Sequence, residues 1–202
     1  MKEDYAYLAN AICDIGAIAA IVEYSRLPVA RLAALVDQVR RAAFWLQENA
    51  QSFGGNPGAI SASGHSAGAH LAFYLAAAGP IEDVPPRAGV TTLFLVSGVY
   101  DLRPITSSFL QAEIELREEE LLAWSPLSAT LQPGIHLEIA VGDRETAPFI
   151  DGAWTLARTV ASGSLPHVIP DADHMSIVRD MADADYQIGQ KFLKFLNLTG
   201  SD

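Results

Sequence analysis

A strand, a tight glycine turn and a helix are predicted to follow one another in the segment 59–78. Small residues at 59–63 indicate a strand, Gly64-His65-Ser66-Ala67-Gly68 forms the turn, and residues 69–78 are rich in good helix formers. The pattern G-x-S-x-G is weak alone, but between a strand and a helix it lifts the serine hydroxyl to the carboxyl end of a sheet. We therefore predict that Ser66 is a nucleophile. The alternative is an ordinary turn in which Ser66 caps the helix.

The residues around Ser66 fit that role. Gly64 and Gly68 flank it at two positions where a tight turn is expected to leave no space for a Cβ atom. The helix N-terminus and the backbone N–H of Ala67 would point at the space where a substrate oxyanion forms. Ala67 is therefore the predicted oxyanion-hole residue.

Strands and helices alternate along the rest of the chain, which is typical of an α/β fold with a mostly parallel sheet flanked by helices. The further predicted strands are Ala17–Glu23, Thr91–Val96, Leu137–Val141 and Pro166–Pro170. The predicted helices are Asp4–Ile15, a long one over about Leu32–Leu46, Pro148–Ala161 and Met175–Leu196, with a mixed helical stretch from about Pro104 to Leu131. With 202 residues, half of them apolar, the chain suits one domain covering 1–202.

A serine hydroxyl needs a histidine to take its proton and a carboxylate to orient that histidine, in the chain order serine, acid, histidine. His174 follows the last predicted strand in a polar turn and precedes the C-terminal helix, so it is the predicted base. The acid is expected in the loop after the strand that ends at Val141, which offers Asp143 and Glu145. Glu145 is preferred and Asp143 is the alternative; the second carboxylate would then be a solvated loop charge.

Composition excludes several classes of function. Acidic residues outnumber basic ones by 24 to 13, and the net charge of −11 disfavours nucleic acid as a partner. No metal-binding or nucleotide-binding motif is found, so no metal and no cofactor are expected. Apolar runs are too short to span a membrane, and the lone Cys13, expected to be buried, leaves no disulfide framework. These features predict a cytoplasmic protein without a membrane partner.

The chain resembles the kynurenine formamidase (arylformamidase) branch of the α/β hydrolases, close to the hormone-sensitive-lipase-like esterases. The resemblance covers nearly its whole length. It is carried by Phe53-Gly54-Gly55-Asn56-Pro57, Ser63-Gly64-His65-Ser66-Ala67-Gly68-Ala69-His70-Leu71, Ser97-Gly98-Val99-Tyr100-Asp101-Leu102-Arg103-Pro104, Ser125-Pro126-Leu127 and Asp173-His174. It implies Ser66 as nucleophile, His174 as base and Glu145 as acid, at a position where such proteins usually have aspartate.

The chain departs from this family in one respect, because the usual His-Gly-Gly motif is absent. In the family, backbone N–H groups of that motif complete the oxyanion hole. Met1 falls where the helix after the motif would begin, so we expect an N-terminally shortened fold without the first three strands. A gap should then separate the strands at 17–23 and 59–63, which must close up, recruit a partner chain or stay poorly ordered. We expect a homodimer, since such edges leave surface to cover.

The expected function is a serine hydrolase that cleaves a small ester or an aryl formamide resembling N-formylkynurenine through an acyl-enzyme. The alternative is a catalytically impaired or truncated relative that binds a ligand or a partner. The segment 101–131 is expected to form a wall of the substrate pocket, with Tyr100, Phe109 and Trp124 lining it, although these aromatic side chains fit a core equally well. The run Glu118-Glu119-Glu120 is expected to be a solvated helix face.

Overall fold

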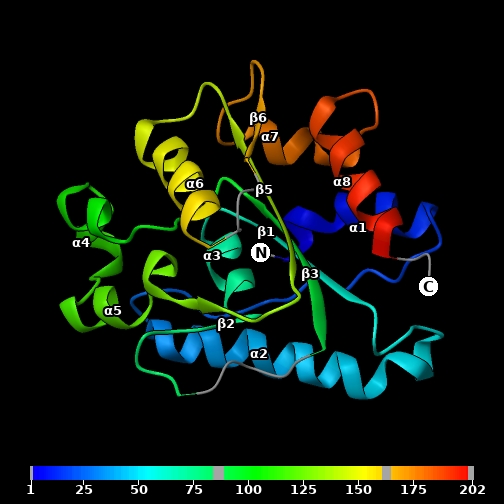
Figure 1. The fold of residues 1–202 in the computed structure, drawn as a ribbon, viewed down its shortest axis with the longest axis horizontal. Coiled ribbons are helices and arrows are strands. Elements are labelled where there is room, and N and C mark those ends of the chain that lie inside the picture. The colour runs from blue at the N-terminus through cyan, green and yellow to red at the C-terminus, as the bar shows by residue number, and fades with distance from the viewer. Residues whose placement is uncertain (1, 84–88, 161–164, 200–202) are drawn as a thin grey trace.

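A parallel four-stranded sheet forms the centre of the computed structural model, which describes residues 2–83, 89–160 and 165–199 (Figure 1). Its strands are β1 (Ile60–His65), β3 (Val90–Val96), β5 (His136–Gly142) and β6 (His167–Ile169), in the spatial order β1-β3-β5-β6. Because all four run in the same direction, their carboxyl ends meet at one edge of the sheet. The predicted α/β architecture is confirmed for these four strands.

Helices cover both faces of the sheet, because each strand alternates its apolar side chains between two cores. Leu93 and Leu95 of β3 belong to the larger core, whereas Phe94 and Val96 belong to the second. The larger core is covered by α2 (Leu32–Asn49), α3 (Ala67–Phe73) and α6 (Ala147–Thr159). The second is covered by α1 (Ala6–Asp14), α7 (Ser176–Arg179) and α8 (Gln187–Thr199).

Two predicted helices differ from expectation, since one ends early and the other is interrupted. The helix after Ser66 stops at Phe73, and the short strand β2 (Ala77–Ala78) pairs antiparallel with β4 (Thr130–Leu131) instead. The C-terminal helix is divided into α7, a 3-10 turn at Asp180–Ala182 and α8. The region between β3 and β5 holds α4 (Gln111–Ile114), α5 (Glu118–Ala123) and 3-10 turns at Arg103–Ser107 and Pro126–Ser128; further 3-10 turns lie at Lys2–Tyr5 and Ala50–Phe53. Ala161, the predicted end of α6, lies outside the described residues.

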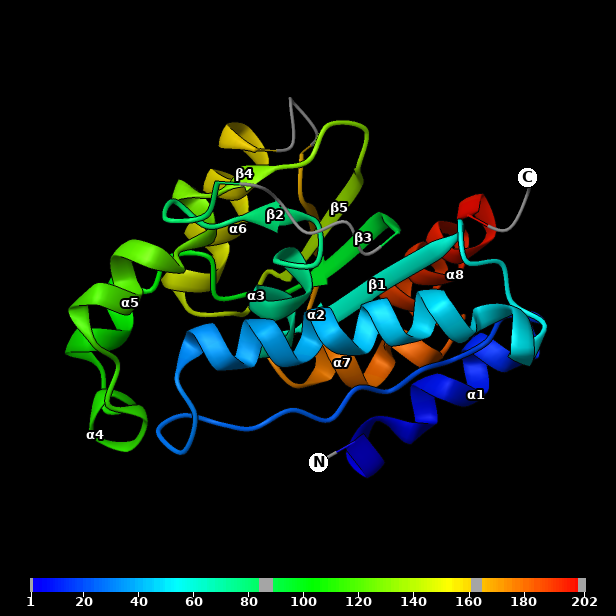
Figure 2. The same cartoon turned by 90° about the horizontal axis from the view of Figure 1, so that it is seen from below.

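The prediction of a strand at Ala17–Glu23 is wrong. The segment between α1 and α2 runs as extended coil below α2 (Figure 2), and among the described residues β1 pairs only with β3. A strand requires a hydrogen-bonding neighbour, and none lies beside this segment in the described part of the sheet. Ile18 and Val22 of this apolar segment are exposed as a result.

A large cleft occupies the space between this coil and the sheet. It has a volume of about 2410 Å³ and is lined by residues 16–27, by β1 and by the inner side of α2. Pockets for small ligands usually measure about 300–1,000 Å³, so this cleft is more than twice as large. The expected gap between two strands is therefore corrected: the structure has a cleft beside β1, at the margin of the described sheet, with coil rather than a strand on its other side.

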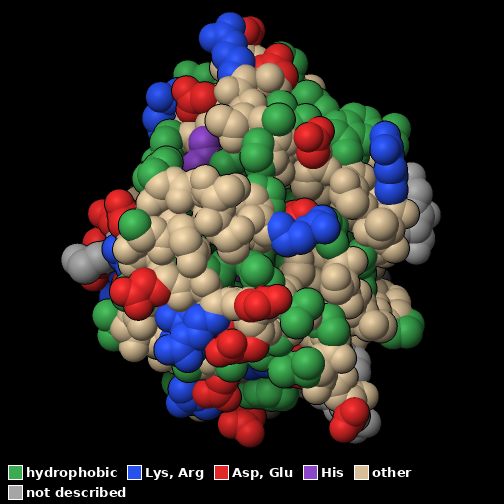
Figure 3. All heavy atoms as spheres, turned by 90° about the vertical axis from the view of Figure 1, so that its left-hand side faces the viewer, with side chains coloured by type: hydrophobic (Ala, Val, Ile, Leu, Met, Phe, Trp, Pro, Cys, Tyr) green, Lys and Arg blue, Asp and Glu red, His purple; other side chains and the backbone are tan. Residues whose placement is uncertain are grey.

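Two expectations about individual side chains are also corrected. Glu120 is buried rather than solvated, because it forms an ion pair with Arg31 and accepts hydrogen bonds from the backbone N–H groups of Leu32 and Arg117. Glu118 and Glu119 remain exposed. Acidic and basic side chains lie close together on the lower part of the face in Figure 3, which is the side of the molecule that carries α4 and α5. Cys13 is exposed rather than buried.

Candidate active site

Ser66 lies in a strained turn between the end of β1 and the start of α3. Its backbone angles are φ 57° and ψ −122°, a conformation that non-glycine residues rarely adopt. The Ser66 N–H donates to the Val96 carbonyl at 3.0 Å, which anchors the turn to the neighbouring strand. The predicted sharp strand-to-helix turn is present in the structure.

Only one of the two flanking glycines is required for steric reasons. A Cβ atom on Gly64 would lie 2.3 Å from the carbonyl oxygen of Gly68, which is far inside contact distance. A Cβ atom on Gly68 would meet only the Tyr24 hydroxyl, at 3.7 Å. The expectation that neither position has space for a side chain is therefore corrected for Gly68.

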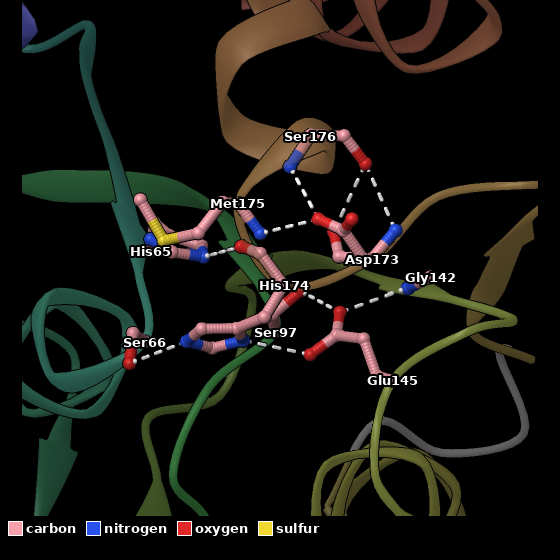
Figure 4. A network of polar contacts seen from close by, with 9 residues as sticks. All are labelled: His65, Ser66, Ser97, Gly142, Glu145, Asp173, His174, Met175 and Ser176. Atoms are coloured by element: carbon pink, nitrogen blue, oxygen red, sulfur yellow. Dashed lines mark hydrogen bonds and ion pairs between the residues drawn. The ribbon is translucent and has the colours of Figure 1, made fainter.

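His174 faces Ser66 from the turn that follows β6. Its Nε2 atom lies 3.0 Å from Ser66 Oγ, and its Nδ1 atom lies 2.7 Å from Glu145 Oε2 (Figure 4). With Nδ1–H donating to the carboxylate, Nε2 is left as the acceptor for the serine hydroxyl. The Asp173 carboxylate accepts the N–H groups of Met175 and Ser176 at 2.9 and 2.8 Å, which fixes the turn.

Glu145 is the carboxylate that the structure brings to His174. Its side chain is buried, and its second oxygen accepts hydrogen bonds from the Ser97 hydroxyl and from the Gly142 N–H, the latter at 3.0 Å. Burial raises the pKa of Glu145, but the hydrogen bonds from His174, Ser97 and Gly142 outweigh burial and lower this pKa below its ordinary value. The carboxylate is therefore charged at neutral pH. Asp143 is exposed, and no hydrogen bond joins it to His174 in the described structure.

Two residues near the site were missed by the sequence analysis. Ser97 follows β3 with a positive φ of 49°, is fully buried and holds Glu145. His65 donates from Nε2 to the His174 carbonyl at 2.7 Å. A polar residue directly after a buried parallel strand is a signal that would have found Ser97. The contact of His65 depends on tertiary packing and has no local signal.

The predicted pocket residues separate into two groups. Tyr100 and Trp124 are buried in the larger core, where Trp124 packs edge-on against Tyr74 with ring centroids 5.2 Å apart. Neither is among the described residues that line the cleft, so both belong to the core alternative. Phe109 is largely exposed and lines the cleft, which also reaches Ser66 and His174. The Phe149 ring, which was not predicted, lies 4.3 Å from the His174 ring.

Ala67 is the candidate oxyanion donor, and the described residues form no metal centre. Ala67 is the first residue of α3 and directly follows Ser66 in the chain. Its backbone N–H therefore has no acceptor within the helix. No group of three or more histidine, cysteine, aspartate or glutamate side chains with metal-binding geometry is found in the part of the chain that the structure describes. None of the described helices combines the length and apolar character needed to cross a membrane.

Comparison with known proteins decides the family. The sequence profile of a protein family, which is described as having the alpha/beta hydrolase fold, matches residues 3–132. This match covers more than half of the chain. The chain belongs to this α/β-hydrolase family. The α/β hydrolase is 28% identical to kynurenine formamidase of Danio rerio over 204 residues, which covers 96% of this chain and 68% of that protein. Kynurenine formamidase of Salmo salar is also 28% identical, over 207 residues, with the same coverage of each chain.

Solved structures share the fold of this α/β hydrolase. An esterase of Pyrobaculum calidifontis superposes with a TM-score of 0.75 at 18% identity, covering 98% of this chain and 69% of that one. The relatives therefore include named formamidases and esterases, which are hydrolases of formamide and ester bonds.

Proposed function

We propose that this α/β hydrolase cleaves a small ester or an aryl formamide through an acyl-enzyme formed on Ser66. The observation that carries the proposal is the continuous hydrogen-bonded series from Ser66 Oγ through the His174 ring to the buried Glu145 carboxylate. The N-formylkynurenine-like substrate is suggested by the similarity to kynurenine formamidases, and a simple ester by the similarity to esterases.

The geometry supports a two-step reaction. In the first step, Ser66 Oγ attacks the substrate carbonyl while His174 Nε2 takes the hydroxyl proton, and the charge on the imidazole is stabilised by Glu145. The Ala67 N–H would donate to the developing oxyanion. Collapse of the tetrahedral intermediate breaks the bond to the leaving group, which receives the proton from His174. In the second step, His174 takes a proton from water, the resulting hydroxide attacks the acyl-enzyme, and the acid is released as Ser66 regains its proton.

A second candidate is a catalytically impaired relative that binds a ligand or partner in the cleft. It is favoured by the open cleft along β1 and by the lack in the sequence of the usual His-Gly-Gly motif, whose backbone N–H groups are oxyanion donors. Removal of one such donor costs about 100- to 1,000-fold in rate in enzymes of this type.

The test is covalent labelling with a fluorophosphonate probe, together with turnover of an aryl acetate and of N-formylkynurenine. We expect the wild type to be labelled and to turn over at least one substrate. Ser66→Ala should abolish both, whereas Ser52→Ala, which changes an exposed serine remote from the turn, should preserve them. A folded wild type that is neither labelled nor active would overturn the proposal in favour of the binding module.

A further inference from the structure

His65 joins the nucleophile turn to the backbone of the residue that faces Ser66. It is the last residue of β1 and directly precedes Ser66. Its Nε2 atom lies 2.7 Å from the His174 carbonyl oxygen, and the two imidazole rings are 4.5 Å apart between centroids (Figure 4). The side chain next to the nucleophile therefore contacts both the backbone and the ring of His174.

The direction of this hydrogen bond is fixed by chemistry. A carbonyl oxygen only accepts, so Nε2 of His65 must carry the hydrogen. Burial and the neighbouring His174 lower the pKa of His65 to about 4, and the ring is therefore neutral at pH 7. A neutral donor holds the carbonyl without opposing the positive charge that His174 would acquire during catalysis.

The contact supplies what the other partners of His174 do not. Glu145 and Ser66 orient the imidazole, and Asp173 fixes the backbone N–H groups that follow it. Among these contacts, only that of His65 ties the backbone of His174 to the strand that delivers Ser66. Because a displacement of about 1 Å at a reacting group costs roughly 100-fold in rate, a direct tie between the two segments matters for proton transfer.

We propose that His65 is a positioning residue, which holds the His174 carbonyl through its Nε2–H and thereby sets the separation of Ser66 Oγ and His174 Nε2. The proposal rests on the proposed serine-hydrolase function. It assigns to the middle residue of the G-x-S motif a role that is distinct from proton transfer and from substrate contact.

Two substitutions at this position separate the donor from the ring. His65→Phe keeps an aromatic ring but removes the donor, and His65→Gln removes the ring but keeps an amide N–H at similar reach. His136→Phe is the matched control, since His136 begins β5 at the opposite end of the sheet from Ser66 and its ring stacks against Phe195. Each variant is assayed for kcat and KM with the aryl acetate, for the rate of fluorophosphonate labelling, and for folded fraction by circular dichroism.

We expect His65→Phe to lower kcat and the labelling rate by about 10- to 100-fold with an unchanged KM, since it loses one hydrogen bond and the registration that the bond provides. His65→Gln should recover most of the rate, and His136→Phe should match the wild type. Equal rates for His65→Phe and the wild type would overturn the proposal, as would a raised KM with unchanged kcat, which would indicate substrate contact instead. A rate loss that simply follows the folded fraction in both His65 variants would overturn it too. Failure of the wild type itself to be labelled would refute the serine-hydrolase function rather than the role of His65.

Discussion

Replacement of Glu145 by glutamine removes the charge beside His174 while preserving the shape of the side chain. The amide oxygen can still accept from Ser97 and from the Gly142 N–H, so the buried site keeps two of its hydrogen bonds. In the wild type, His174 Nδ1 lies 2.7 Å from the Glu145 carboxylate. In the variant, the amide NH₂ faces this atom, and a donor at this place favours the His174 tautomer with hydrogen on Nε2. In that tautomer, His174 cannot accept the proton of Ser66.

The expected loss is large because two effects act together: the wrong tautomer and the loss of the charge that stabilises the imidazolium. The equivalent acid-to-amide change in a serine protease triad lowers kcat by about 10,000-fold, which corresponds to about 5.5 kcal/mol at about 1.36 kcal/mol per tenfold change. We expect Glu145→Gln to slow both fluorophosphonate labelling and aryl acetate turnover by roughly this factor at pH 7, with KM little changed.

Asp143→Asn is the matched control for this experiment, because it removes the same charge two residues earlier from an exposed side chain. It should retain the wild-type rates. If Glu145→Gln stays within tenfold of the wild type, or if Asp143→Asn loses as much activity, then the assignment of Glu145 as the acid is refuted. The lowered pKa of Glu145 adds a condition, because the stability that the ionised carboxylate contributes is fully present above about pH 4.5 and is lost as the pH falls through the lower folded-state pKa.

Two further outcomes are expected from the packing around the site. Gly64→Ala should lower the free energy of unfolding by about 3 kcal/mol or more and Tm by roughly 6–12 °C, because its Cβ atom would overlap the Gly68 carbonyl; thermal unfolding measures this. His70 is buried with a pKa lowered by burial from 6.5 to about 4, so an unfolded chain takes up its proton first on acidification. This difference costs the wild type up to about 3 kcal/mol of its free energy of unfolding between pH 6.5 and 4. His70→Asn, which keeps a donor near the Val99 carbonyl, should lack this pH-dependent loss in denaturant titrations.

Controls for these two variants come from the same chain. Gly58→Ala places a Cβ atom no closer than 3.4 Å to its nearest neighbour, the Asn56 side chain, and should change Tm little. An equal drop in Tm for both glycine variants would contradict the steric argument. For His70→Asn, an unaltered slope of stability against pH would mean that folding does not lower the pKa of this histidine.

The sequence was sufficient to predict most of the sheet and the three residues that the structure brings together at the candidate site. Alternating strands and helices located β1, β3, β5 and β6 to within a few residues, because buried parallel strands are short apolar runs between turn residues. The need of a serine nucleophile for a histidine and a carboxylate, in the chain order serine, acid, histidine, brought Ser66, Glu145 and His174 into one expectation. The structure then placed Glu145, and not Asp143, beside His174.

The errors arose where tertiary context decides the outcome. An apolar run such as Ala17–Val22 has the composition of a strand, but a strand exists only where another strand offers hydrogen bonds. Glu120 lay in a run of three acidic residues that is typical of a solvated helix face, and its burial depends on Arg31, which lies 89 residues away in the sequence. The hydrogen bonds of Ser97 and His65 likewise join residues that are distant in the chain.

The cleft beside β1 makes the stability of the chain sensitive to its surroundings. The exposed side chains of Ile18 and Val22 face water, and a sheet margin bordered by a cleft is a template for an additional extended segment. Any peptide that binds only the folded chain at this margin stabilises it by RT ln(1 + [L]/Kd), which is about 2.7 kcal/mol at a hundredfold excess over Kd. Melting temperatures measured with such a peptide would therefore rise with its concentration, so that stability would be a property of the mixture as well as of the chain.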